Sequence, residues 1–95
     1  MPQYNWFCGY QIYYWSDEGR PLEPLHFHIA KAPRKNATKV WIMSDGSMKV
    51  ENIANDVKDI TVSRIIRIMK EYVDDYTNEW ESFFGVKASY YDLQN

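Results

Sequence analysis

The stretch Thr38-Lys-Val-Trp-Ile-Met-Ser-Asp-Gly-Ser-Met-Lys-Val-Glu-Asn-Ile53 decides the fold, because apolar residues alternate on both sides of a turn sequence. A two-residue Asp-Gly loop would place Ile42 opposite Lys49 and would mix apolar and charged residues on one face. A three-residue loop with Gly46 in the left-handed position pairs Ile42 with Met48 instead. This register gathers the apolar residues on one face, and a slip by one residue would undo it. We therefore predict an antiparallel hairpin with a bulged turn.

Two further strands precede this hairpin, and one helix follows it. Aromatic and β-branched residues predict strands at 10–15 and 25–31, besides those at 38–43 and 48–53. From Val62 to Phe84 apolar residues recur at helical spacing, with Thr61 as N-cap and Gly85 as C-terminal stop. Such a helix spans roughly 35 Å, which is long enough to cross the sheet. The sequence predicts an α+β fold, a four-stranded antiparallel sheet packed by one long C-terminal helix.

Charge along the predicted helix runs against its macrodipole. Basic residues lie in its N-terminal half and acidic residues follow: Arg64, Arg67 and Lys70, then Glu71, Asp74, Asp75, Glu79 and Glu81. The macrodipole favours the reverse order by a few tenths of a kcal/mol per group. This pattern indicates either a solvated helix face or a bipolar surface for a partner.

The composition bounds the functional class. A net charge of −2 argues against a strongly basic nucleic-acid-binding protein. One segment is nevertheless basic and free of acids, with Lys31, Arg34, Lys35 and Lys39. The single cysteine, Cys8, excludes an intrachain disulfide and favours a reducing compartment. Because no signal peptide and no membrane-spanning run is recognisable, we expect a cytoplasmic protein without a membrane partner.

The two histidines lie one residue apart in Pro24-Leu-His-Phe-His-Ile29. Strand alternation places His26 and His28 on one face and their apolar neighbours on the other. The same alternation adds three aromatic residues to the histidine face: Tyr13, Trp15 and Trp41. This face is either open, and then marks a partner or ligand site, or covered by a loop, the N-terminal segment or the C-terminal tail.

Three chemical roles for His26 and His28 remain open. A metal needs a third ligand, for which Cys8, Asp17 and Glu23 are nearest in sequence, and this ligand count favours no metal and no cofactor. As a ribonuclease-like acid and base, the two rings would act beside the basic segment and a stacked base. Neighbours on a strand stand side by side, however, whereas in-line cleavage needs acid and base on opposite sides of the phosphorus. The third role is structural, with both rings hydrogen-bonded to loop carbonyls or to a neighbouring aromatic residue.

Three segments resemble a known family: Pro24-Leu-His-Phe-His-Ile29, Val40-Trp-Ile42 and Glu79-Trp-Glu-Ser-Phe-Phe-Gly85. The sequence from about residue 9 to residue 85 resembles the small prokaryotic family catalogued as domain of unknown function 4160. The resemblance implies a compact α+β domain with no established activity, substrate or cofactor, and we expect residues 1–85 to form this single domain. Members are often encoded beside another small protein, which implies a toxin–antitoxin-like pairing. Leu25 departs from the second proline of typical members, and residues 86–95 form a C-terminal tail specific to this chain.

The sequence therefore predicts a small intracellular protein-interaction module that binds through its aromatic and histidine face. A toxin–antitoxin-like pair is its most concrete version, with the product of an adjacent gene or a second copy as partner and RNA as a weaker one. The alternative is a His-dependent ribonuclease or phosphodiesterase with His26 and His28 as catalytic residues. The predicted binding residues are Tyr13, Trp15, His26, His28, Trp41, Lys31, Arg34, Lys35 and Lys39.

Overall fold

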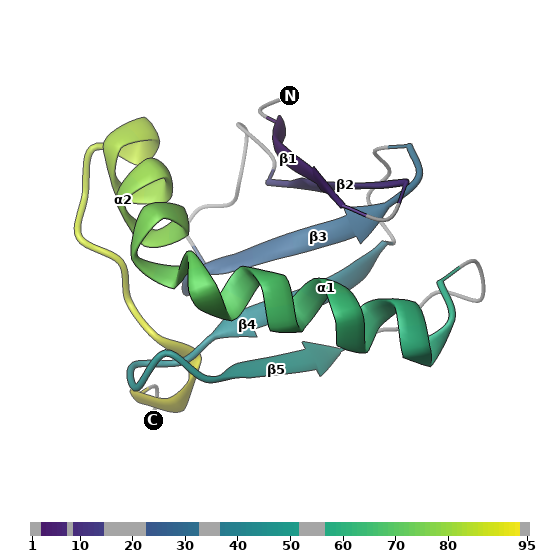
Figure 1. Cartoon of the computed structure of the whole chain (residues 1–95). Helices are drawn as coiled ribbons and strands as arrows, with labels where there is room; N and C mark the ends of the chain where they lie inside the picture. The colour runs from purple at the N-terminus through teal and green to yellow at the C-terminus, as the bar shows by residue number, and fades with distance from the viewer. Residues whose placement is uncertain (1–2, 8, 15–22, 33–36, 52–56, 94–95) are drawn as a thin grey trace.

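The computed structural model describes residues 3–7, 9–14, 23–32, 37–51 and 57–93 of the 95-residue chain, 3–7 by their backbone. In these described segments, one antiparallel sheet of five strands is followed by two helices and a short 3-10 turn (Figure 1). The strands are β1 Gln3–Phe7, β2 Tyr10–Tyr13, β3 His26–Ala30, β4 Thr38–Ile42 and β5 Met48–Glu51. The helices are α1 Asp59–Glu71, α2 Val73–Phe84 and η1 Tyr91–Leu93. The predicted α+β class is confirmed, with one more strand than the sequence indicated.

The β4–β5 hairpin has the register that its apolar pattern predicts. Ile42 pairs with Met48 and Val40 pairs with Val50 across the two strands. Gly46 has a φ of 87°, which is the left-handed conformation that the bulged turn requires. The three-residue loop is therefore confirmed, and all four apolar side chains lie on the face that the helices cover.

The helical segment consists of two helices, so the single long helix is corrected. Tyr72 interrupts it with φ −122° and ψ 23°, and its N–H donates to the Met69 carbonyl at 3.0 Å. The break places Lys70 in the last turn of α1 and places Asp74 and Asp75 in the first turn of α2. Each charge then lies at the helix end that the macrodipole favours. For these three residues the charge order suits two helices better than one, whereas Glu71 and Glu81 still lie near C-terminal helix ends.

The start and the end of the helical segment differ in how well they were predicted. The N-cap is Lys58, and Thr61 lies inside the first turns of α1, so the predicted cap is wrong. Asp59 stands in the first turn, where its negative charge meets the positive end of the helix. Gly85 ends α2 with a φ of 70°, and its N–H donates to the Glu81 carbonyl at 2.8 Å, as predicted. Within the described residues, no helix is both long and apolar enough to cross a membrane.

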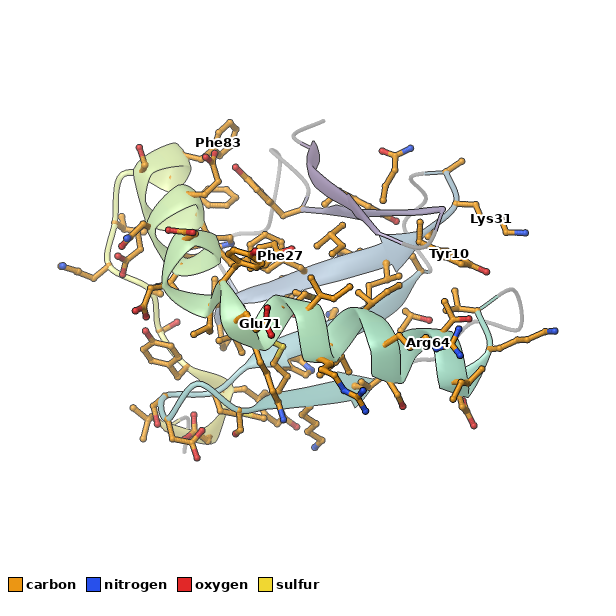
Figure 2. The ribbon with its side chains drawn as sticks, viewed as in Figure 1. Tyr10, Phe27, Lys31, Arg64, Glu71 and Phe83 are labelled. Atoms are coloured by element: carbon orange, nitrogen blue, oxygen red, sulfur yellow. The ribbon has the colours of Figure 1, made fainter. Side chains whose placement is uncertain are left out.

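The core lies between one face of the sheet and the two helices (Figures 1 and 2). Phe27 is fully buried at its centre, with the ring edges of Tyr14 and Tyr76 at centroid distances of 5.5 and 5.2 Å. The other large buried members are Ile12, Leu25, Ile29, Val40, Ile42, Val62, Ile65, Met69 and Trp80. Because this packing fixes which side chains of β2, β3 and β4 face inward, it also fixes which ones lie on the opposite face.

Candidate functional site

The sheet face opposite the helices carries the two histidines and two of the predicted aromatic residues. In the register of β3 with its neighbours, His26 pairs with Trp41 and His28 pairs with Tyr13. Each pair puts two rings on the same side of adjacent strands. The alternation argument is thus confirmed for these four residues, and Trp15 lies outside the described residues.

Five rings on this face form a continuous series of contacts, here called the ring series. Tyr13 stacks on His28 at 5.5 Å between centroids, and His28 meets His26 edge to face at 5.2 Å. His26 lies 5.0 Å from Trp41, and Trp41 stacks on Tyr91 at 4.7 Å with an interplanar angle of 23°. The series crosses three strands and ends on the C-terminal tail.

Burial distinguishes the last ring from the other four. Tyr13, His26, His28 and Trp41 are between 0% and 5% exposed, whereas Tyr91 is 38% exposed. The sequence left open whether this face is open or covered, and for these four side chains it is covered. The ring series therefore reaches solvent at Tyr91, a residue that the strand pattern could not assign to the face.

His26 has a structural role that fixes its tautomer. Its Nδ1 lies 2.8 Å from the Pro24 carbonyl oxygen. Because a carbonyl only accepts, Nδ1 must carry the hydrogen and donate it. This bond ties the start of β3 to the preceding turn, as the structural interpretation of the histidines predicts.

The metal and catalytic interpretations find less in the geometry. Among the described residues no three His, Cys, Asp or Glu side chains gather as a metal site. Glu23 pairs with Lys39 at 3.5 Å, while Cys8 and Asp17 lie outside the described residues. Both imidazoles are at most 4% exposed, so no phosphate can reach them while their cover is in place.

Charged side chains surround the Trp41 end of the ring series. The indole Nε1–H of Trp41 donates to the Glu51 carboxylate. The Lys39 ammonium lies 4.7 Å from the Trp41 ring centroid, and the Lys49 ammonium lies 4.8 Å from that of Tyr91. Such cation–π contacts favour flat, electron-rich rings beside ammonium groups. The predicted hairpin register already implied this cluster, because it places Lys39 opposite Glu51 and Trp41 opposite Lys49.

The two predicted basic residues that the structure describes, Lys31 and Lys39, lie apart from each other. Lys39 belongs to the ring-series face, but Lys31 directly follows the last residue of β3, Ala30. Its ammonium is 5.8 Å from the ring of Tyr10, a residue of the helix-covered core (Figure 2). Arg34 and Lys35 lie outside the described residues. Of the two described residues of this segment, Lys39 lies beside the ring series and Lys31 does not.

The C-terminal tail is fixed to the domain by contacts that flank Tyr91. The Leu25 N–H donates to the Ser89 carbonyl at 2.9 Å. The Ser44 N–H and hydroxyl donate to the Asp92 carboxylate at 3.1 and 2.6 Å. These bonds from Ser44 hold the pKa of Asp92 below its ordinary value. The tail is therefore attached both before and after Tyr91, and these attachments hold Tyr91 against Trp41.

Acid is expected to release this end of the tail. A carboxylate whose pKa is lowered by folding stabilises the folded contact above its unfolded pKa, and that contribution is lost as the pH falls through the folded pKa. The Ser44 amide and Trp41 indole resonances should therefore shift together below about pH 4. In Asp92→Asn, the Ser44 amide and Trp41 indole resonances should have their low-pH positions already near pH 7, while the other resonances stay unchanged. Unchanged Ser44 and Trp41 resonances in Asp92→Asn would contradict this attachment.

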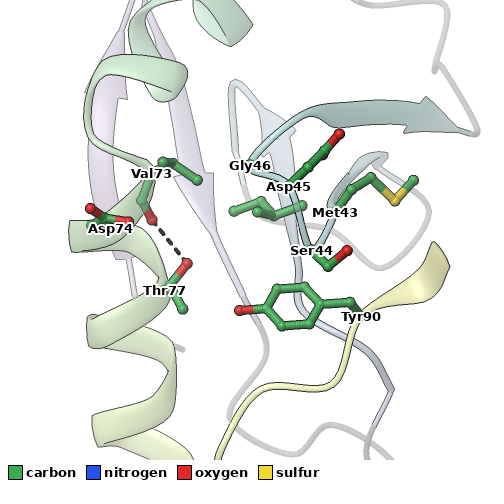
Figure 3. Close-up of a pocket in the computed structure, with 9 residues that line it drawn as sticks. Met43, Ser44, Asp45, Gly46, Val73, Asp74, Thr77 and Tyr90 are labelled. Carbon is green, nitrogen blue, oxygen red and sulfur yellow. Dashed lines mark hydrogen bonds between the residues drawn. The ribbon is translucent and has the colours of Figure 1, made fainter. Parts of the chain in front are cut away.

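A cavity of about 260 Å³ lies between the β4–β5 turn, the start of α2 and the tail (Figure 3). Asp45, Asp74, Thr77 and Tyr90 bring polar groups to its wall. Thr77 is already bonded, because its hydroxyl donates to the Val73 carbonyl at 2.9 Å. None of the predicted site residues that the structure describes lines this cavity. The ring series and the cavity are therefore separate features of the molecule.

Comparison with known proteins identifies a matching family. The model of a family described as a domain of unknown function (DUF4160) matches residues 9–81. No curated protein and no solved structure matches the chain. The matched segment includes four rings of the ring series and ends before Tyr91, so the exposed end of the series lies outside it.

Proposed function

The chain belongs to the family of domain of unknown function 4160, and we propose that it is a small protein-interaction module. Its partner binds at the exposed end of the ring series. The observation that carries this proposal is Tyr91, which is 38% exposed and lies flat on the buried Trp41. Leu93 adds an apolar side chain that is 64% exposed. Aromatic side chains supported from below are typical anchors of protein interfaces.

The charges around this surface define the chemistry of the partner. Lys49 is exposed and lies against the Tyr91 ring, and Lys39 lies against the Trp41 ring. Lys39 already pairs with Glu23 at 3.5 Å, and the carboxylate of Asp92 lies next to Tyr91 in the chain, so Lys49 is the cation considered for a partner. The surface thus fits a protein segment that brings an apolar side chain to Tyr91 and a carboxylate to Lys49.

The resemblance to family members encoded beside a second small protein makes that neighbour the first partner to test. We propose a toxin–antitoxin-like pair in a prokaryotic cytoplasm as the concrete form of this interaction. Such a pair would bury Tyr91 and Leu93, the exposed apolar side chains of η1. The proposal rests on this surface and on the family, and it requires no cofactor.

Tyr91→Ala is expected to weaken partner binding by roughly thirtyfold or more, since the truncation of an aromatic anchor costs on the order of 2 kcal/mol. The tagged chain is co-expressed with the adjacent gene product, and the affinity of the purified pair is measured by calorimetry. Tyr72→Ala is the matched control, because Tyr72 is 47% exposed but lies between the two helices. Equal weakening by both variants, or by neither, would contradict the proposed surface.

The ribonuclease interpretation stays a prediction from the sequence, because the burial of His26 and His28 does not favour it. The same purified protein can test it on RNA between about pH 5 and pH 8, where an imidazole changes charge. The interaction proposal expects intact RNA. Cleavage that His28→Ala abolishes, in a variant that remains folded, would replace the interaction proposal by the enzymatic one.

A further inference from the structure

The outer edge of β5 is the second surface with defined chemistry. β5 is the last strand of the sheet, and within the described residues it pairs with β4 alone (Figure 1). Its backbone groups on the outer side therefore offer hydrogen bonds to another strand. Lys49 and Glu51, two residues apart, carry opposite charges on one face of this edge.

The hairpin ladder determines which backbone groups of β5 point outward. The Met43 N–H donates to the Ser47 carbonyl at 2.8 Å, so this pair is hydrogen-bonded. Hydrogen-bonded pairs alternate along an antiparallel ladder, and Lys49 and Glu51 therefore direct their backbone groups to β4. Met48 and Val50 direct theirs away from β4, toward any strand that would be added.

We propose that two copies of this chain associate through β5 by a two-fold antiparallel pairing centred on Val50. In this register the outward N–H and C=O of Val50 bond to those of Val50 in the second copy. Lys49 of each copy then stands opposite Glu51 of the other, which forms two cross-strand ion pairs. Non-hydrogen-bonded pairs have the shorter Cα separation, so these side chains meet at close range.

Charge excludes the other symmetric registers that satisfy the outward backbone groups. A pairing of Met48 with Val50 of the second copy places Lys49 opposite Lys49, which is repulsive. A pairing centred on Met48 places Lys49 opposite Ser47 and leaves Glu51 without a basic partner in the edge. Pairing about Val50 is therefore the register that this edge encodes.

The two charged side chains have contacts within the single chain that the pairing must accommodate. Glu51 is held by the indole N–H of Trp41, and a carboxylate keeps further acceptor positions. Lys49 is exposed, and its ammonium is held over the Tyr91 ring. Both contacts lie on the β4 side of the strand, so Lys49 must turn from Tyr91 toward the edge when the ion pair forms, while Glu51 can keep its bond to Trp41. A four-residue edge buries little area, so we expect a weak dimer that forms at high protein concentration.

The experiment is a charge exchange followed by sedimentation velocity over a concentration series. Lys49→Glu places Glu opposite Glu, and Glu51→Lys places Lys opposite Lys, so each variant alone should dimerise at least about tenfold more weakly. An equimolar mixture of the two variants restores both ion pairs and should form a heterodimer. Lys87→Glu, which makes the same change of charge on the exposed segment after α2, should dimerise like the unchanged chain.

Three results would overturn the proposal: a chain that stays monomeric at every concentration, a dimer that Lys49→Glu leaves intact, or a mixture that remains monomeric. Because Glu51→Lys also removes the acceptor of the Trp41 indole, its fold is checked by circular dichroism. Should that variant not fold, Lys49→Ala and Lys49→Glu still decide the question. The proposal requires that Lys49→Ala dimerises more weakly than the unchanged chain and that Lys49→Glu dimerises more weakly still. This proposal does not depend on the interaction at Tyr91, which Tyr91→Ala tests separately.

Discussion

Replacing Trp80 by Ala is expected to lower the free energy of unfolding by about 3–5 kcal/mol, in the range found for buried Trp truncations. Trp80 is 1% exposed in the core, and its ring lies 4.7 Å from that of Phe84. Its removal leaves a cavity between α2 and the sheet that the surrounding side chains fill only in part. Since small domains are stable by about 5–15 kcal/mol, urea denaturation should show a large shift of the midpoint.

Trp80→Phe is the matched control for this prediction. The indole Nε1 of Trp80 is buried and has no hydrogen-bond partner in the part of the chain that the structure describes. Its loss therefore breaks no such bond, and the Phe ring retains much of the packing. We expect a cost of about 1–2 kcal/mol, clearly below that of Ala. Equal losses for Phe and Ala would contradict a role in packing alone.

The buried residues of the helical segment could be predicted from the sequence, but the break between its two helices was not predicted. The apolar stripe identifies Tyr76 and Trp80 as core residues, because burial on one face needs only helical spacing. The apolar stripe continues through Tyr72, so it does not indicate the helix break there. The charges do indicate a break, because Lys70 is typical of a helix end and Asp74 and Asp75 are typical of a new helix start.

In the sheet, too, one part was predicted from the sequence and another was missed. The β4–β5 register follows from adjacent residues and was predicted. β1 was missed, although Phe7 pairs with Tyr10 around Gly9, whose φ of 80° is typical of a tight hairpin turn. The alternation of Gln3-Tyr-Asn-Trp was the available signal, and it is too short to stand out against an irregular segment.

The sequence predicted which candidate site residues share one face of the sheet, but it did not predict that they are buried. Alternation is enough to put His26, His28 and Trp41 on one side of the sheet, because it acts within each strand. Their burial depends on what lies over them, and part of that cover is Tyr91. Its position is set by Asp92 and Ser44, which are 48 residues apart in sequence. No local pattern contains such a contact.

Trp41→Ala is the second prediction with a large effect, and it acts on stability and on binding together. Trp41 is 5% exposed and contacts His26, Tyr91 and Glu51, so we expect unfolding to become easier by about 3–5 kcal/mol. The same change removes the support beneath Tyr91, so partner binding should fall as it does in Tyr91→Ala. Trp41→Phe keeps a stacked ring and loses only the indole donor, and it should retain most of the binding.

A double-mutant cycle between Trp41 and Tyr91 separates these two effects. If Tyr91 binds the partner from its position on Trp41, the two truncations remove one shared anchor, and their effects on affinity will not add. Tyr91→Ala should then weaken binding strongly in the unchanged chain and little in Trp41→Ala, measured where circular dichroism shows every variant folded. Fully additive losses would mean that Tyr91 acts without Trp41. The four buried rings of the ring series would then stabilise the fold only, and the C-terminal tail alone would bind the partner.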